Sequence, residues 1–215
     1  MYVMYSIQPD WCFKIFNLIG HRADGTPIYE KSVEVRKNIP KLTVPFRGLV
    51  YCTKPKSQKD KGLCIDEGKL GFVFKCNYEA AEKFGMTLLD GKVIGEFVCD
   101  EITEMYVGRV GTDENGEYIC LDTTSDVLRK QACLTEKQLY DYSNGGKLYG
   151  LHLSEVKLYP KPKDLSCFRK PCKNELYCEE CGMYREHESK CGNEALIMYR
   201  APQSWCYCEV MTNEL

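Results

Sequence analysis

The chain has 215 residues, of which 44% are hydrophobic and 28% charged, which fits one large globular domain. The formal net charge of −2 excludes the global cationic field with which some proteins bind nucleic acid without specificity. No apolar run approaches the roughly 20 residues of a membrane helix, and the first eleven residues lack the features of a signal peptide. We therefore expect a cytoplasmic protein with no membrane partner.

The predicted elements begin with a strand over 2–7 that runs into a helix over 9–18, where Pro9 suits the first helical turn. Residues 31–36 alternate with period two, which predicts a strand. A helix over 134–141 is predicted from a capping box at its start, and Asn-Gly-Gly at 144–146 ends it. Further strands are predicted at 49–53, 72–76, 93–102, 149–156, 195–200 and 205–210, a short helix at 78–84, and a hairpin turn at 113–116.

This order of elements, with roughly six to eight short strands and few helices, favours a mainly β (α+β) domain. We expect a small closed or half-open β-barrel with peripheral helices rather than a βαβ sheet. The whole chain, 1–215, is predicted to be one domain. Residues 167–194 hold five cysteines, many charges and little strand pattern, so we interpret them as a Cys-rich insertion before the final strands.

The fourteen cysteines are the most unusual feature of the composition. Those of the first 133 residues are scattered singly and suit small buried side chains. In the predicted insertion, Cys172, Cys178, Cys181 and Cys191 are the right ligand types for a tetrahedral zinc ion. Four thiolates leave no open position for water, so the predicted zinc is structural. The alternatives are buried free thiols or a redox disulfide.

The strand predicted at 31–36 carries Lys31, Glu34 and Arg36. Strand geometry puts Glu34 and Arg36 on one face, roughly 6.5–7 Å apart. Lys31 beside Glu34 in a cleft forms a candidate catalytic pair, with the lysine as base or nucleophile. Arg36 can hold a phosphate or a base edge through two hydrogen bonds. The alternative is an ordinary ion-paired face of a sheet.

Two local basic segments suit single-stranded RNA, because cations beside aromatic rings combine phosphate contacts with base stacking. The first contains Lys54 and Lys56, and the second contains Lys161 and Lys163 near Tyr159. A solvated surface is the alternative for both segments. Two further residues that precede the last strand, Gln203 and Ser204, would line the cleft and read a base edge.

Four stretches together resemble the ASCH family of the PUA-like superfamily. They are Ser-Ile-Gln-Pro at 6–9, Lys-Ser-Val-Glu-Val-Arg at 31–36, Lys-Val-Ile-Gly-Glu-Phe at 92–97, and the segment 151–165. Two departures are present: Ile28 and Tyr29 precede the signature lysine where the family has a glycine, and Ser32 replaces a threonine. The resemblance covers about residues 1–165 and the final strands.

The resemblance implies an RNA-associated barrel in which the strand at 31–36 lines the cleft. Some relatives are amidohydrolases of a modified cytidine that use a lysine at the position of Lys31, and others are reported as ribonucleases. The leading hypothesis is an RNA-binding module that accepts a nucleotide or modified base. The alternatives are a ribonuclease or modified-cytidine amidohydrolase in the same cleft, and a zinc-stabilised protein-interaction module.

Overall fold

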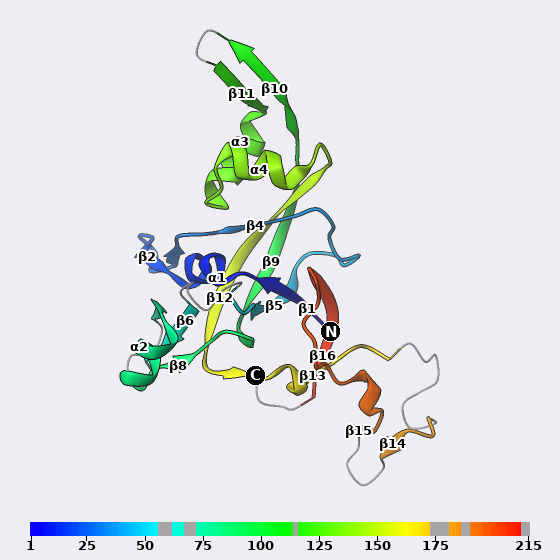
Figure 1. The fold of residues 1–215 in the computed structure, drawn as a ribbon. Helices are drawn as coiled ribbons and strands as arrows, with labels where there is room; N and C mark the ends of the chain where they lie inside the picture. Colours follow the sequence, from blue (N-terminus) through cyan, green and yellow to red (C-terminus); the bar gives the residue numbers. More distant parts are fainter. Residues whose placement is uncertain (56–61, 67–71, 114–115, 173–180, 186–189, 212–215) are drawn as a thin grey trace.

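A seven-stranded mixed sheet forms the centre of the fold (Figure 1). The computed structural model describes residues 1–55, 62–66, 72–113, 116–172, 181–185 and 190–211. The strand order is β13-β16-β1-β5-β9-β12-β4, and only β1 and β5 pair in parallel. The strands are β1 (Tyr2–Ile7), β4 (Val33–Arg36), β5 (Phe46–Cys52), β9 (Lys92–Met105), β12 (Leu148–Lys163), β13 (Phe168–Arg169) and β16 (Trp205–Val210).

Smaller elements surround this sheet. Figure 1 shows α3, α4, β10 and β11 together at one end of the long strands β9 and β12. The helices are α1 (Pro9–Phe16), α2 (Tyr78–Lys83), α3 (Thr123–Gln131) and α4 (Glu136–Ser143), with 3-10 turns at Leu165–Cys167 and Glu194–Leu196. The small sheets are β2 (Leu18–His21) with β3 (Pro27–Tyr29), β6 (Gly62–Ile65) with β7 (Val73–Cys76) and β8 (Thr87–Leu88), β10 (Val107–Asp113) with β11 (Gly116–Leu121), and β14 (Tyr184–Arg185) with β15 (Lys190–Cys191). Within the described ranges, no helix combines the length and apolar character needed to cross a membrane.

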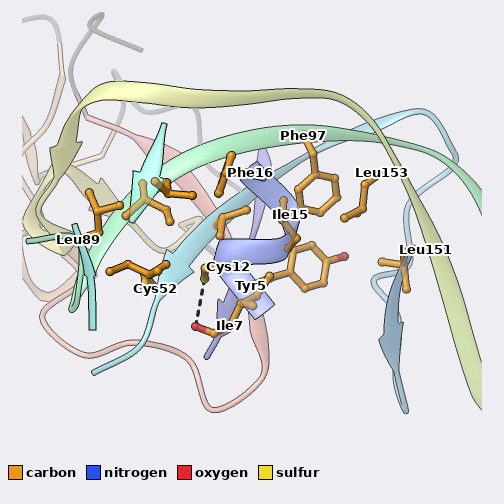
Figure 2. Close-up of a cluster of buried hydrophobic side chains, with 14 of the residues drawn as sticks. Tyr5, Ile7, Cys12, Ile15, Phe16, Cys52, Leu89, Phe97, Leu151 and Leu153 are labelled. Carbon is orange, nitrogen blue, oxygen red and sulfur yellow. Dashed lines mark hydrogen bonds between the residues drawn. The ribbon is translucent and has the colours of Figure 1, made fainter. Parts of the chain in front are cut away.

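The main hydrophobic core lies between α1 and the central strands (Figure 2). Tyr5 and Phe97, both fully buried, stack with ring centroids 5.7 Å apart. Ile15 and Phe16 of α1 pack into the same cluster, and the Cys12 thiol donates to the carbonyl of Ile7. These contacts fix α1 against the sheet and so place Gln8, the residue between β1 and α1.

The predicted barrel is not confirmed. In the part of the chain that the structure describes, the sheet is open, with β13 and β4 as its two edge strands. The mainly β class is confirmed, since strands outnumber helices and form the central layer. The four-residue strand β4 pairs only with β12 among these residues, so no backbone ladder closes the sheet.

Local signals predicted most of the elements well. The strand at 2–7, the helix that begins at Pro9 and the strand at 205–210 are confirmed. The capping box of Thr135 and Gln138 is present at α4. The strand predicted at 195–200 is wrong, because the side chain of Asn193 accepts from the backbone of Ala195 and caps a 3-10 turn there.

A glycine near the start of β9 permits the close approach of its neighbours. A Cβ at Gly95 would overlap the backbone carbonyl of Lys157 and the ring of Phe16. We expect Gly95→Ala to lower the free energy of unfolding by about 1–3 kcal/mol, since overpacking forces backbone and ring to shift. Urea denaturation measures this change. Gly20→Ala is the matched control, because no described atom beyond its chain neighbours lies within 4 Å of the place that the added methyl group would take. An equal loss in both variants would contradict the prediction.

Candidate functional site

A cleft of about 790 Å³ opens beside the carboxyl ends of β1 and β4. Its volume falls within the range of small-molecule sites, about 300–1,000 Å³. The start of α1 forms one wall of the cleft, and α4 forms another. The floor comes from β4 and from Lys31, which precedes this strand. The lining residues are Ser6, Ile7, Gln8, Trp11, Lys31, Glu34, Val35, Arg36, Lys37, Asn38, Thr53, Leu134, Gln138, Tyr142, Gln203 and Ser204.

Three buried charged side chains form the floor of this cleft. The Glu34 carboxylate lies between two cations: Oε2 is 3.1 Å from Lys31 Nζ, and Oε1 is 2.8 Å from Arg36 Nη2. Lys31 is 2% exposed, and Glu34 and Arg36 are each 7% exposed. Because water is excluded here, each cation depends on the carboxylate for compensation.

The local sequence explains this arrangement. Alternation along β4 sends Val33 and Val35 into a hydrophobic cluster, while Glu34 and Arg36 line the cleft. The direction of Lys31 was open from the sequence alone. Its backbone N–H donates to the carbonyl of Lys14 in α1, and its side chain enters the cleft and joins Glu34.

Lys31 has two further contacts besides Glu34. Its Nζ donates to the carbonyl of Ala132 at 3.2 Å and lies 5.1 Å from the centre of the Trp11 ring. Ala132 is the C-cap of α3, where the helix dipole is negative. Carboxylate, carbonyl and ring face all attract a positive charge, so the surroundings of Lys31 are those of an ammonium group.

Arg36 connects β4 with the far side of the sheet. Its Nη2 donates to the carbonyl of Ser6 at 3.1 Å, and its Nη1 donates to Ser204 Oγ at 3.4 Å. The guanidinium also lies 5.4 Å from the ring of Tyr5. Its buried Nε has no hydrogen-bond partner among the described residues. This side chain therefore links three segments that are distant in sequence.

Burial alone would raise the pKa of Glu34, but the charges of Lys31 and Arg36 outweigh it and lower that pKa below its ordinary value of 4.5. Oε2 makes only the ion contact with Lys31, without good hydrogen-bond geometry. Glu34 is therefore ionised in the folded protein at neutral pH, and the floor carries two cations and one anion.

The structure brings together five of the predicted site residues: Lys31, Glu34, Arg36, Gln203 and Ser204 all line the cleft. Among the other predicted basic residues, the described Lys54, Lys161 and Lys163 do not line it. Lys54 directly follows the lining residue Thr53, with its side-chain carbons near Gly91, and Lys56 lies outside the described residues. Lys161 and Lys163 lie near the far end of β12, away from the cleft lining.

Sequence reasoning missed several lining side chains, among them Gln8, Lys37 and Tyr142. A usable signal exists on α4, since Gln138 and Tyr142 are four residues apart and so share one helical face. Nothing in the sequence indicated which element this face would cover.

The predicted zinc ligands lie only partly within the described residues. Cys181 and Cys191 belong to one small hairpin, in which Tyr184 pairs with Cys191 and donates its N–H to the carbonyl of Cys181. Cys172 is exposed, and Cys178 lies outside the described residues. The described residues contain no group of three or more potential metal ligands, so the zinc site stays a prediction.

No family model matches the sequence, and no curated protein matches it. Among solved structures, the chain is similar to ASCH from Zymomonas mobilis, with 19% identity and a TM-score of 0.43 over 76% of this chain and 73% of that one. A single-residue mutant of the same protein gives 20% identity and a TM-score of 0.43, over 76% of this chain and 74% of the other. The similarity is to the family that the sequence resembles.

The ion triad of the floor predicts a pH-dependent stability. Glu34→Gln leaves two buried cations without their shared anion, and we expect a loss of about 3–5 kcal/mol in the free energy of unfolding at pH 7. Since the pKa of Glu34 is lower in the folded protein, its contribution is complete above pH 4.5 and declines as the pH falls below that value. The two proteins should therefore converge in stability in acid, as measured by denaturation at pH 7 and pH 3.

Asp141→Asn serves as the control, because Asp141 pairs with Lys137 at an exposed position, where an ion pair contributes little. A difference between wild type and Glu34→Gln that stays constant from pH 7 to pH 3 would contradict the role given to the Glu34 charge.

The zinc prediction has its own measurement. We expect about one zinc per chain in protein purified without chelator, and loss of that zinc in the double variant Cys181→Ser, Cys191→Ser. Cys120→Ser, at an exposed cysteine outside the predicted insertion, should keep the metal. A metal-free protein with fourteen titratable thiols would refute the site.

Proposed function

We propose that the cleft binds a nucleotide of single-stranded RNA and that the protein is an RNA-binding module which accepts an ordinary or modified base. The observation that carries this proposal is the composition of the lining. A buried arginine, amide and hydroxyl groups, and aromatic rings converge on one cavity of about 790 Å³. These are the groups that proteins use to recognise unstacked bases in RNA.

The charge of the lining supports a ligand that carries phosphate. Lys31, Arg36 and Lys37 are cationic, and Glu34 is the one acidic residue among the lining side chains that the structure describes. A local excess of positive charge in a chain with net charge −2 attracts an anion to this cleft rather than to the whole surface.

The neutral polar groups support recognition of a base edge. Gln203 is exposed at the rim, Ser204 accepts a hydrogen bond from Arg36, and Gln8 stands at the start of α1. An amide offers both a donor and an acceptor, so it can pair with the edge of a base in two parallel hydrogen bonds.

An enzyme in the same cleft is the second candidate, favoured by the direct contact between Lys31 and Glu34. A nucleophilic lysine must first lose its proton, whereas the three contacts of Lys31 are those of a charged group. The geometry therefore supports binding more strongly than turnover by Lys31.

A binding measurement tests the proposal. We expect fluorescein-labelled RNA decamers of A, C, G or U to bind with an affinity that decreases with salt, because phosphates are contacted. Gln203→Ala should weaken binding about 2- to 12-fold, the equivalent of one hydrogen bond of 0.5–1.5 kcal/mol. Gln131→Ala is the control, since this glutamine of α3 is exposed and lies outside the cleft lining.

Failure of the wild-type protein to bind any of the decamers or the corresponding nucleoside monophosphates would contradict the proposal. Degradation of RNA or deacylation of a modified nucleoside, abolished in Lys31→Ala with the fold intact, would instead establish the enzyme. A flat salt response would contradict the phosphate contacts.

A further inference from the structure

Two aromatic rings line the cleft from different helices, and they differ in what already occupies their faces. Trp11 of α1 has two ammonium groups near its ring, with Lys14 Nζ at 5.4 Å and Lys31 Nζ at 5.1 Å from the centroid. Tyr142 of α4 has one, Lys37 Nζ at 5.3 Å. Trp11 thus helps to hold Lys31 of the floor, whereas Tyr142 contacts one exposed cation outside the floor.

Tyr142 also has the position of a platform at the cleft mouth. Its side chain is 38% exposed and yet lines the cavity. Burial raises the pKa of its hydroxyl, with smaller opposing effects from Arg36 and Glu34. A side chain that is partly exposed and also lines the cavity can meet a base that enters from solvent.

Lys37 is the cation beside this ring, and it has no acidic partner among the described residues. Lys14 pairs with Glu30 at 3.3 Å, and Lys31 pairs with Glu34. No carboxylate in the described part of the chain lies within ion-pair distance of Lys37, which is exposed directly after the last residue of β4. An exposed ammonium group without a counter-charge, adjacent to an aromatic face, can accept a phosphate at little cost.

From these observations we infer that Tyr142 is the stacking platform for one unstacked base of a single-stranded RNA and that Lys37 contacts the phosphate of the same nucleotide. This inference rests on the proposed function and specifies it further. Stacking is tolerant of base identity, since every base presents a π-face, so Gln203 and its neighbours provide the selection. Trp11 instead positions Lys31, whose Nζ lies 5.1 Å from the centre of its ring.

The test compares variants that keep or remove the ring. With labelled RNA decamers as probes, we expect Tyr142→Leu to weaken binding about 5- to 150-fold, the loss typical of one base–aromatic stack. Tyr142→Phe should remain within about twofold of the wild-type protein, because the ring is kept. Tyr199→Leu is the matched control, since Tyr199 is 72% exposed and outside the cleft lining.

The phosphate contact is tested by the salt dependence. In a plot of log affinity against log salt concentration, Lys37→Gln should reduce the slope by about 0.7, the value for one phosphate contact of a single strand. Lys41→Gln, an exposed lysine four residues away, should leave the slope unchanged. Competition by nucleoside monophosphates, compared with orthophosphate, separates recognition of the whole nucleotide from recognition of phosphate alone.

The inference would be overturned if Tyr142→Leu bound RNA within twofold of the wild-type affinity, or if Lys37→Gln left the salt slope unchanged. Either result would leave the proposed function intact. Equal losses in the Leu and Phe variants of Tyr142 would also overturn it, because the hydroxyl rather than the ring would then be responsible. Thermal melting of each variant establishes that the fold is retained. Absence of binding by the wild-type protein would overturn both proposals together.

Discussion

The geometry of the cleft depends on one shared anion, the carboxylate of Glu34 between Lys31 and Arg36. Two cations that are almost fully buried would repel each other and lose their hydration without it. Through these contacts Glu34 fixes the entry and the end of β4 in one conformation. The same two cations also donate hydrogen bonds to backbone carbonyls, Lys31 at the end of α3 and Arg36 in β1. One charge thus connects α3, β4 and β1 beside the cavity.

The cleft exists because side chains, rather than a backbone ladder, join the two sides of the sheet. Arg36 reaches Ser204 just before β16, and Trp205 Nε1 donates to the carbonyl of Asn38 after β4. The hydroxyl of Tyr207 accepts from the backbone of Lys41 in the same region. Side-chain bridges span a wider gap than the 4.7–4.9 Å between paired strands. The gap between the edge strand β4 and β16 therefore holds a pocket where a closed barrel would have continuous backbone pairing.

Predictions from the sequence succeeded where the signal needs only near neighbours. The alternation at 31–36 placed Glu34 and Arg36 on one face, and the pair Thr135 and Gln138 defined the start of α4. The strand at 195–200 is wrong because the side chain of Asn193 caps a 3-10 turn there, and a closed barrel is not confirmed because closure depends on how distant segments pair. Tyr142 was missed for the same reason: its helical face is visible in the sequence, but the docking of α4 beside β4 is a tertiary event.

The charge balance of the floor indicates what the cavity can accept. Two cations face one carboxylate, and the negative end of α3 at Ala132 compensates only part of the excess, since a helix terminus carries roughly half a charge. A residual positive charge in a partly buried site attracts an anion or a carbonyl-rich ligand and disfavours a cationic one. The floor therefore supplies a fixed electrostatic field. At the rim, Lys37 and Gln203 are exposed and provide contacts that adapt to a particular ligand.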